Sequence, residues 1–188
     1  GARVCVLGTE DSMQFVRDGG GNIVKLEQGL DLDVLAVCDD SGFDFLHGIE
    51  WALSAVVRAI DEGRRPRLVL PNPDLVYPRS PGELGITAGA IALVIEAALA
   101  RRFPHERWQF DRLGKPEPHL FLQAAQRLGI EPAKLVMIGD QIETDVAGAH
   151  AAGCDAALLA GVSRWRAEHT TEGTNAVAPT WLLDKLWP

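Results

Sequence analysis

The chain has 188 residues, of which 47% are hydrophobic, and its mean hydropathy is +0.03. These values are typical of soluble globular proteins and leave room for one large or two small domains. The net charge of −8 argues against partners such as nucleic acid or an anionic membrane surface, because both attract clustered Lys and Arg. No apolar run approaches the roughly 20 residues that span a bilayer.

Cysteine usage and the first residues bear on the cellular setting. Cys5, Cys38 and Cys154 stand singly inside apolar runs, without the paired spacing of a zinc site or a disulfide framework. We therefore expect buried free thiols in a reducing, cytoplasmic compartment. The chain begins Gly1-Ala2-Arg3, without Met or a signal-peptide pattern, and enters a strand-like run at once. We expect further residues upstream.

Along the chain, short apolar runs alternate with segments of helical period, which predicts an α/β fold with a mainly parallel sheet. The expected strands cover residues 3–7, 34–38, 67–70, 107–110, 134–138 and 154–159. The expected helices cover residues 49–60, 88–100, 119–128 and 142–152. The polar stretch 166–178 predicts an exposed loop, and the apolar segment 181–187 should pack back onto the body. A change of composition at residues 103–105 predicts a domain boundary.

The clearest chemical signal follows the expected strand 134–138. The strand ends in Gly139 and Asp140, and a second acid, Asp145, comes five residues later. In open α/β sheets, ligands bind beyond the carboxyl ends of strands, where two carboxylates suit a hard cation such as Mg²⁺. Alone, the same residues are equally explained as a helix cap and a favourable first-turn acid.

A lysine strengthens the chemical interpretation. Lys115 lies in Gly114-Lys115-Pro116-Glu117-Pro118, just before the helix that precedes this strand. A lysine on a turn framed by Gly and Pro offers a fixed cation that can neutralise a phosphoryl oxygen or orient a carboxylate.

Together these residues resemble the haloacid-dehalogenase (HAD) superfamily, and within it the class IIA, NagD-like and p-nitrophenyl-phosphatase-like branch. Lys115 in GKPEPHLF matches the third motif of that superfamily, and Asp140 and Asp145 in GDQIETDVAGAHAAG match the fourth. Upstream, LPNPD at 70–74, with Tyr77-Pro78 and GITAGAIA at 85–92, resembles the class IIA cap signature. The resemblance implies an α/β cap domain over residues 1–104. It implies the C-terminal half of a Rossmann-like, parallel-sheet HAD core over residues 105–188.

The resemblance also implies an activity: hydrolysis of a small phosphorylated metabolite through an aspartyl-phosphate, with Mg²⁺ as cofactor. Asp140 would bind the metal directly, Asp145 would support it through water, and Lys115 would hold charge at the phosphoryl group. Asn72, Asp74 and Tyr77 of the cap are candidate substrate-binding residues, although Asn72-Pro73-Asp74 can also be explained as an ordinary turn.

The chain departs from the family in one respect. The strand leading into Asp-x-Asp-Gly-Thr, which carries the nucleophile, precedes the cap in the family and is absent from these 188 residues. Asp39 and Asp40 also follow a strand, but neither has a second carboxylate two residues on, and they fit a turn of the cap better. We therefore expect this chain alone to be inactive. A complementing N-terminal segment, a second copy of the chain, or a non-catalytic HAD-like binding domain remain alternatives.

Overall fold

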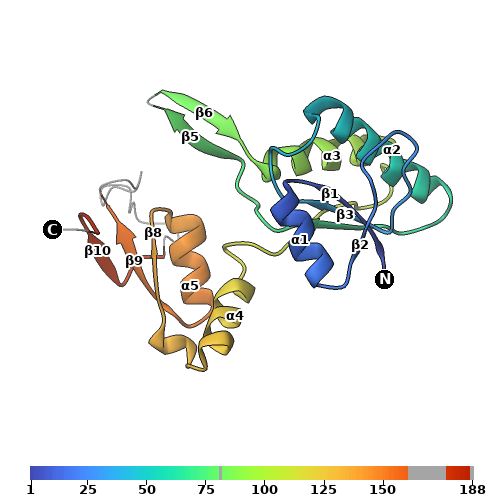
Figure 1. Cartoon of the computed structure of the whole chain (residues 1–188). Coiled ribbons are helices and arrows are strands. Elements are labelled where there is room, and N and C mark those ends of the chain that lie inside the picture. The colour runs from blue at the N-terminus through green and yellow to red at the C-terminus, as the bar shows by residue number, and fades with distance from the viewer. Residues whose placement is uncertain (81, 161–176, 187–188) are drawn as a thin grey trace. The chain divides into compact units, whose positions relative to one another are not determined.

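The protein is described from a computed structural model, and the structure describes residues 1–80, 82–160 and 177–186 (Figure 1). The chain divides into two compact units, Gly1–Leu113 and Gly114–Pro188, which are called unit 1 and unit 2 below. Helices and parallel strands alternate in both units, which confirms the predicted α/β class. None of the described helices is long and apolar enough to cross a membrane.

The described residues of unit 1 form a five-stranded parallel sheet in the order β2-β1-β3-β4-β7. Its strands are β1 (Arg3–Leu7), β2 (Asn22–Ile23), β3 (Val34–Val37), β4 (Arg67–Leu70) and β7 (Asp111–Arg112). β1 and β3 pair from Val4 opposite Val34 to Leu7 opposite Val37. The strands predicted at 3–7, 34–38 and 67–70 are confirmed, whereas the strand predicted at 107–110 lies at 111–112.

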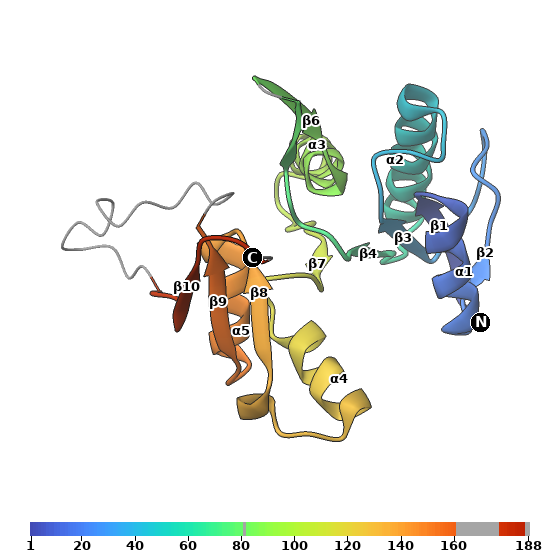
Figure 2. The same ribbon diagram turned by 60° about the vertical axis from the view of Figure 1, so that its left-hand side comes forward.

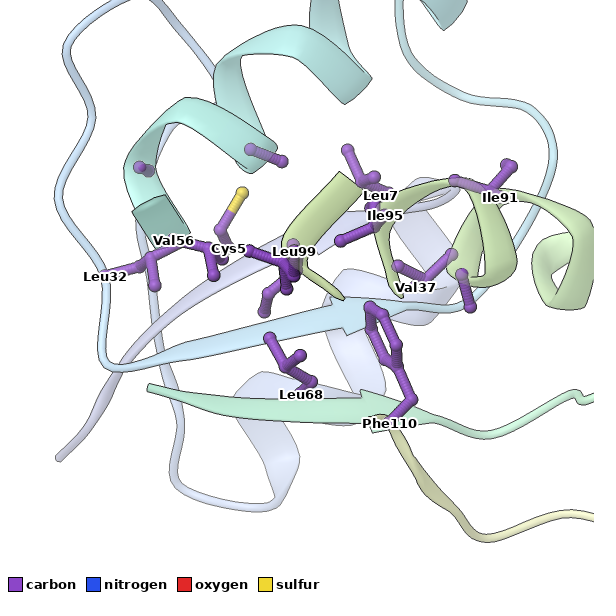
Figure 3. Close-up of a cluster of buried hydrophobic side chains, with 14 of the residues drawn as sticks. Cys5, Leu7, Leu32, Val37, Val56, Leu68, Ile91, Ile95, Leu99 and Phe110 are labelled. Carbon is purple, nitrogen blue, oxygen red and sulfur yellow. The ribbon is translucent and has the colours of Figure 1, made fainter. Parts of the chain in front are cut away.

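Helices cover both faces of this sheet. They are α1 (Glu10–Asp18), α2 (Phe45–Asp61) and α3 (Ala88–Arg102). Alternate residues of β1 face opposite sides, so that Cys5 and Leu7 join the main core with α2 and α3 (Figure 3). Val4 and Val6 pack on the α1 side. The buried stripe of α2, which includes Val56 and Ile60, confirms the helix predicted from its period.

Four elements of unit 1 were not predicted: α1, β2, and the strands β5 (Val76–Ser80) and β6 (Glu83–Ile86), which form an antiparallel hairpin. The side chain of Thr9 caps α1, but that helix carries little apolar surface, and its Phe15 is 77% exposed. The hairpin projects from the layered body of the unit (Figure 1). Pro78 interrupts its apolar pattern and hides the strand from a sequence reading.

The division between the units falls later than the predicted boundary at 104/105. Trp108 and Phe110 are buried in the main core of unit 1, at 9% and 4% exposure. The carboxylate of Glu96 in α3 accepts a hydrogen bond from the backbone N–H of Phe110 at 2.8 Å. Residues 105–113 therefore complete unit 1, because their apolar side chains and β7 pack there.

The described residues of unit 2 form a three-stranded parallel sheet in the order β10-β9-β8 (Figure 2). Its strands are β8 (Val136–Gly139), β9 (Asp155–Leu159) and β10 (Trp181–Leu183), and its helices are α4 (His119–Leu128), the 3-10 turn η1 (Pro132–Lys134), the π-helical turn η2 (Ile142–Val146) and α5 (Ala147–Ala151). The helix predicted at 142–152 thus begins as a π turn. The segment predicted to return at 181–187 pairs with β9, while most of the predicted loop 166–178 lies outside the described residues.

Only one face of this sheet carries a core among the described residues. Phe121 of α4 and Val146 and Ala149 after β8 pack with Ala156 and Leu158 of β9. On the other face, the β8 side chains of Val136 and Ile138 are 48% and 49% exposed. In the described sheet, β8 pairs only with β9 and forms an open edge. A parallel sheet is normally covered on both faces.

Candidate functional site

The candidate site lies where β8 ends in Gly139. The next residues turn sharply into η2, which brings the carboxylate of Asp145 back against the end of the strand. A Cβ atom on Gly139 would overlap the carboxylate carbon and oxygen of Asp145. Glycine is therefore required at 139 so that the carboxylate can approach the backbone closely.

Asp145 is the buried centre of this site, at 2% exposure. Its Oδ2 accepts hydrogen bonds from the backbone N–H groups of Asp140 at 3.0 Å and Gln141 at 3.2 Å. Its Oδ1 pairs with the amine of Lys115, whose side chain is 30% exposed. Both carboxylate oxygens are thus occupied by donors, as a buried charge requires.

The turn that carries Lys115 is held by packing against α5. A Cβ atom on Gly148 of α5 would lie 2.7 Å from Cε2 of Phe121 and 3.0 Å from the carbonyl oxygen of Pro116. The absence of a side chain at 148 allows this close approach, which places Lys115 beside Asp145. Gly148 was missed from the sequence, although its place in the GAHAAG run of small residues was the available signal.

Asp140 differs from Asp145 in its surroundings. It is exposed, and among the described residues no hydrogen bond or ion pair involves its carboxylate. This carboxylate is the group of the site that remains available to a cation. Within the described residues no cluster of three or more His, Cys, Asp or Glu could hold a metal. The donor set fits Mg²⁺ in chemical type, but a complete shell needs water, substrate or a further segment.

Lys115, Asp140 and Asp145 lie together in unit 2, and the predicted substrate-binding residues belong to unit 1. The side chain of Asn72 accepts a hydrogen bond from the backbone N–H of Asp74 at 3.1 Å, as in an Asx turn. A Cβ on Gly89 would overlap the carbonyl oxygens of Pro73 and Asp74, so this turn packs closely on the start of α3. Tyr77 lies on the hairpin, 36% exposed.

Asp39, the alternative nucleophile, is occupied by local contacts. Its Oδ2 accepts from the backbone N–H of Thr9 at 3.1 Å, from Oγ1 of Thr9 at 3.2 Å and from Oγ of Ser12 at 2.6 Å. These contacts tie the turn after β3 to the start of α1. Because three local donors already occupy this oxygen of Asp39, the structural role is favoured.

Comparison with known proteins identifies what the second part of the chain is similar to. The HAD-hydrolase-like family model matches residues 112–188, which contain Lys115, Asp140 and Asp145. Residues 112–188 are thus similar to the HAD-like hydrolases. The recognition made from the third and fourth motifs is therefore confirmed.

Some similar proteins match nearly all of the chain. Mouse chronophin is 28% identical over 188 residues, which cover 97% of this chain and 60% of chronophin. The structure of a possible sugar phosphatase of the HAD superfamily from Cytophaga hutchinsonii is 25% identical, with a TM-score of 0.75, and the match covers 98% of this chain and 64% of that one.

A third relative was solved with a metal. It is a glycerol phosphate phosphatase from Mycobacterium tuberculosis in complex with magnesium, 23% identical with a TM-score of 0.73, and the match covers 97% of this chain and 50% of that one. The HAD-like chain thus spans less than two thirds of the length of each of these relatives.

Proposed function

We propose that this chain is part of a Mg²⁺-dependent HAD phosphatase that acts on a small phosphorylated metabolite. The observation that carries the proposal is the Lys115–Asp145 pair at the carboxyl end of β8, with the exposed carboxylate of Asp140 beside it. Two carboxylates and a fixed amine at the end of a parallel strand suit the handling of a phosphoryl group.

Each residue has a proposed role. Asp140 would hold Mg²⁺ directly, and Asp145 would act on the metal through water, because Lys115 and two backbone N–H groups already occupy its oxygens. Mg²⁺ would supply charge stabilisation to the phosphoryl oxygens when bound. Lys115, oriented by Asp145, would hold its positive charge at the same oxygens. The aspartate that forms the aspartyl-phosphate would come from outside these 188 residues.

The open edge of unit 2 supports this division of the site. A strand that adds in parallel to β8 would pair with the backbone groups of its open edge and end beside Asp140. A carboxylate at the end of such a strand would complete the reacting set. This arrangement predicts that the chain alone is inactive. A second copy of the chain is the alternative occupant.

Unit 1 would serve as the cap and unit 2 as the C-terminal part of the core, with residues 105–113 belonging to the cap unit by their packing. Asn72 would shape the cap turn, while Asp74 and Tyr77 would contact the substrate. The phosphatases named among the relatives support a small substrate. The three free cysteines support a cytoplasmic enzyme, because disulfides are rare in reducing compartments.

The deciding experiment measures Mg²⁺-dependent hydrolysis of p-nitrophenyl phosphate by the chain alone and after the upstream segment is added back. We expect hydrolysis only in the second case, and its loss in Asp140→Ala. Activity of the chain alone, lost in Asp140→Ala, would show that it contains its own nucleophile. No activity in either case, with both preparations folded, would reject the phosphatase and favour a non-catalytic binding domain.

A further inference from the structure

Helix α3 is apolar on the side that faces away from its own core. Ile91, Ile95 and Leu99 point into the main core of unit 1 (Figure 3). The opposite side becomes charged only in the last turn and before it carries Ala90, Leu93, Val94, Ala97 and Ala100. Leu93 is 42% exposed and Val94 is 59% exposed. Because a helix at the surface of a domain normally carries polar residues on its outer side, this side has the composition of a buried one.

The strand β6, which leads into α3 and contacts it, adds to this surface. Its residues Leu84 and Ile86 are 56% and 45% exposed. Among the described residues β6 pairs only with β5, so that its other edge is open. Pro78 removes one backbone donor from β5, which leaves β6 as the better edge for a further strand. A two-stranded hairpin has little stability of its own in water, and an apolar open edge favours pairing with another chain.

No charge interrupts this surface. Residues 84–95 contain no Asp, Glu, Lys or Arg, although these four types make up 23% of the chain. The acids that bound the run are engaged within unit 1: Glu83 accepts a hydrogen bond from Oγ of Ser80 at 2.9 Å, and Glu96 accepts one from the backbone N–H of Phe110 at 2.8 Å. A charged partner would find no complementary group here. Two copies of this chain, each with a net charge of −8, repel one another except where uncharged surfaces of this kind meet.

We propose that the outer side of α3 and the open edge of β6 form the interface of a homodimer. A two-fold axis would place each element against its own copy, with β6 antiparallel to β6 of the second chain. The outer side of α3 is about 22 Å long and about 10 Å wide, less than the about 800 Å² that each partner of a stable complex buries, so the strand edge has to take part. The inference does not depend on the phosphatase function, and this dimer leaves the edge of β8 free for the upstream segment.

The dimer is tested by sedimentation equilibrium of the 188-residue chain. Val94→Lys should raise the dissociation constant at least about tenfold, because it places a charge in both halves of an uncharged interface. The matched control is Ser54→Lys, at an exposed position of α2, which adds the same charge and should leave the dissociation constant unchanged. A chain that is monomeric at every concentration, or a dimer equally stable in both variants, would overturn the proposal.

A mixture of Val94→Lys with Val94→Glu tests whether the face meets its own copy. Opposite charges on the two chains should restore the association that each variant lacks alone. If the mixture associated no more tightly than either variant, the face would not be an interface between copies.

Hydrogen exchange tests the same interface without any substitution. Amides of β6 should become more protected as the protein concentration rises, because pairing removes them from water. Amides of β8 should keep the same protection. Concentration-dependent protection of β8 in place of β6 would assign the association to the open edge of unit 2 and overturn the proposal.

Discussion

At the level of single residues, Asp145 organises the site through three interactions on one buried carboxylate. The identities of Lys115, Asp140 and Asp145 could be predicted from the sequence because they occupy recognisable motifs. Their separate roles were expected only from the resemblance, and the enclosure of the Asp145 carboxylate by donors could not be predicted from the residues themselves. A sequence places an acid near a strand end, but the path of the following turn decides whether that acid faces solvent or the backbone.

Removing this carboxylate should destabilise unit 2. Asp145→Ala leaves the amine of Lys115 and two backbone N–H groups without their acceptor. We expect the unfolding free energy of unit 2 to fall by about 3 kcal/mol, the lower end for a broken buried pair, because Lys115 is partly exposed. Hydrogen exchange of the β8 and β9 amides would measure the change. The matched control, Asp140→Ala, removes an exposed acid and should change it by less than about 0.5 kcal/mol. Equal losses in the two variants would contradict the assigned roles.

At the level of elements, strands with uninterrupted apolar runs were predictable, whereas elements that depend on local pairing were not. β1, β3 and β4 were found because their residues are buried on both faces of a parallel sheet. The β5–β6 hairpin was missed because Pro78 breaks the run and cross-strand pairing stabilises it. The π turn η2 was read as ordinary helix, since the hydrogen bond from Val146 N–H to the carbonyl of Gln141 has no sequence signature.

Close packing of α5 on the Lys115 turn gives a prediction for Gly148. Gly148→Ala should overlap Phe121 and push the turn away, at a cost of about 1–3 kcal/mol in the stability of unit 2. Phe121→Leu in the same protein should recover part of that loss, because a smaller side chain relieves the overlap. Thermal unfolding of the single and double variants would measure both effects. Strictly additive losses would show that Gly148 and Phe121 do not compete for space.

The start of β1 predicts a dependence of stability on pH. Side-chain and backbone hydrogen bonds from Arg3 hold the pKa of Asp33 well below its ordinary value, and the side chain of Arg3 also lowers the pKa of Asp31. A carboxyl whose pKa is lowered in the folded state stabilises the fold at pH values above its unfolded pKa of about 4. This stabilisation is lost as the pH falls from the unfolded pKa toward the folded pKa.

Unit 1 should therefore unfold at lower urea concentration at about pH 3 than at about pH 6. The effect should be modest because these carboxylates are solvent-exposed. Arg3→Ala should lower the urea midpoint at the higher pH and reduce the difference in midpoint between the two pH values. An unchanged difference in Arg3→Ala would place the acid sensitivity elsewhere.

At the level of the whole molecule, the two units differ in how complete they are. Unit 1 has helices on both faces of its sheet and a continuous core from Cys5 to Phe110. Unit 2 shows a core on one face and an open edge at β8. The sequence predicted the existence of two parts. The predicted boundary at 104/105 follows the change in composition, whereas Trp108 and Phe110 beyond it pack in the first core.

Residues 1–113 should consequently fold when expressed alone. Their unfolding in urea can be monitored by the fluorescence of Trp51 and Trp108. We expect the midpoint of this transition to match the midpoint of the more stable of two transitions of the whole chain. Adding the upstream segment should raise the urea midpoint of the less stable transition, because a segment that binds only the folded state stabilises that state. If the whole chain unfolded in a single transition and residues 1–113 alone showed no cooperative transition, the two units would depend on each other for folding.

The Lys115–Asp145 contact also bears on how the protein folds. Its two residues are 30 positions apart, and α4, β8 and the turn after β8 lie between them. Bringing such distant residues together costs chain entropy that the intervening elements must first offset. The amine and the carboxylate should therefore meet late in the refolding of unit 2, after β8 has paired with β9. During refolding, formation of this ion pair would then report that unit 2 has finished folding rather than that it has begun.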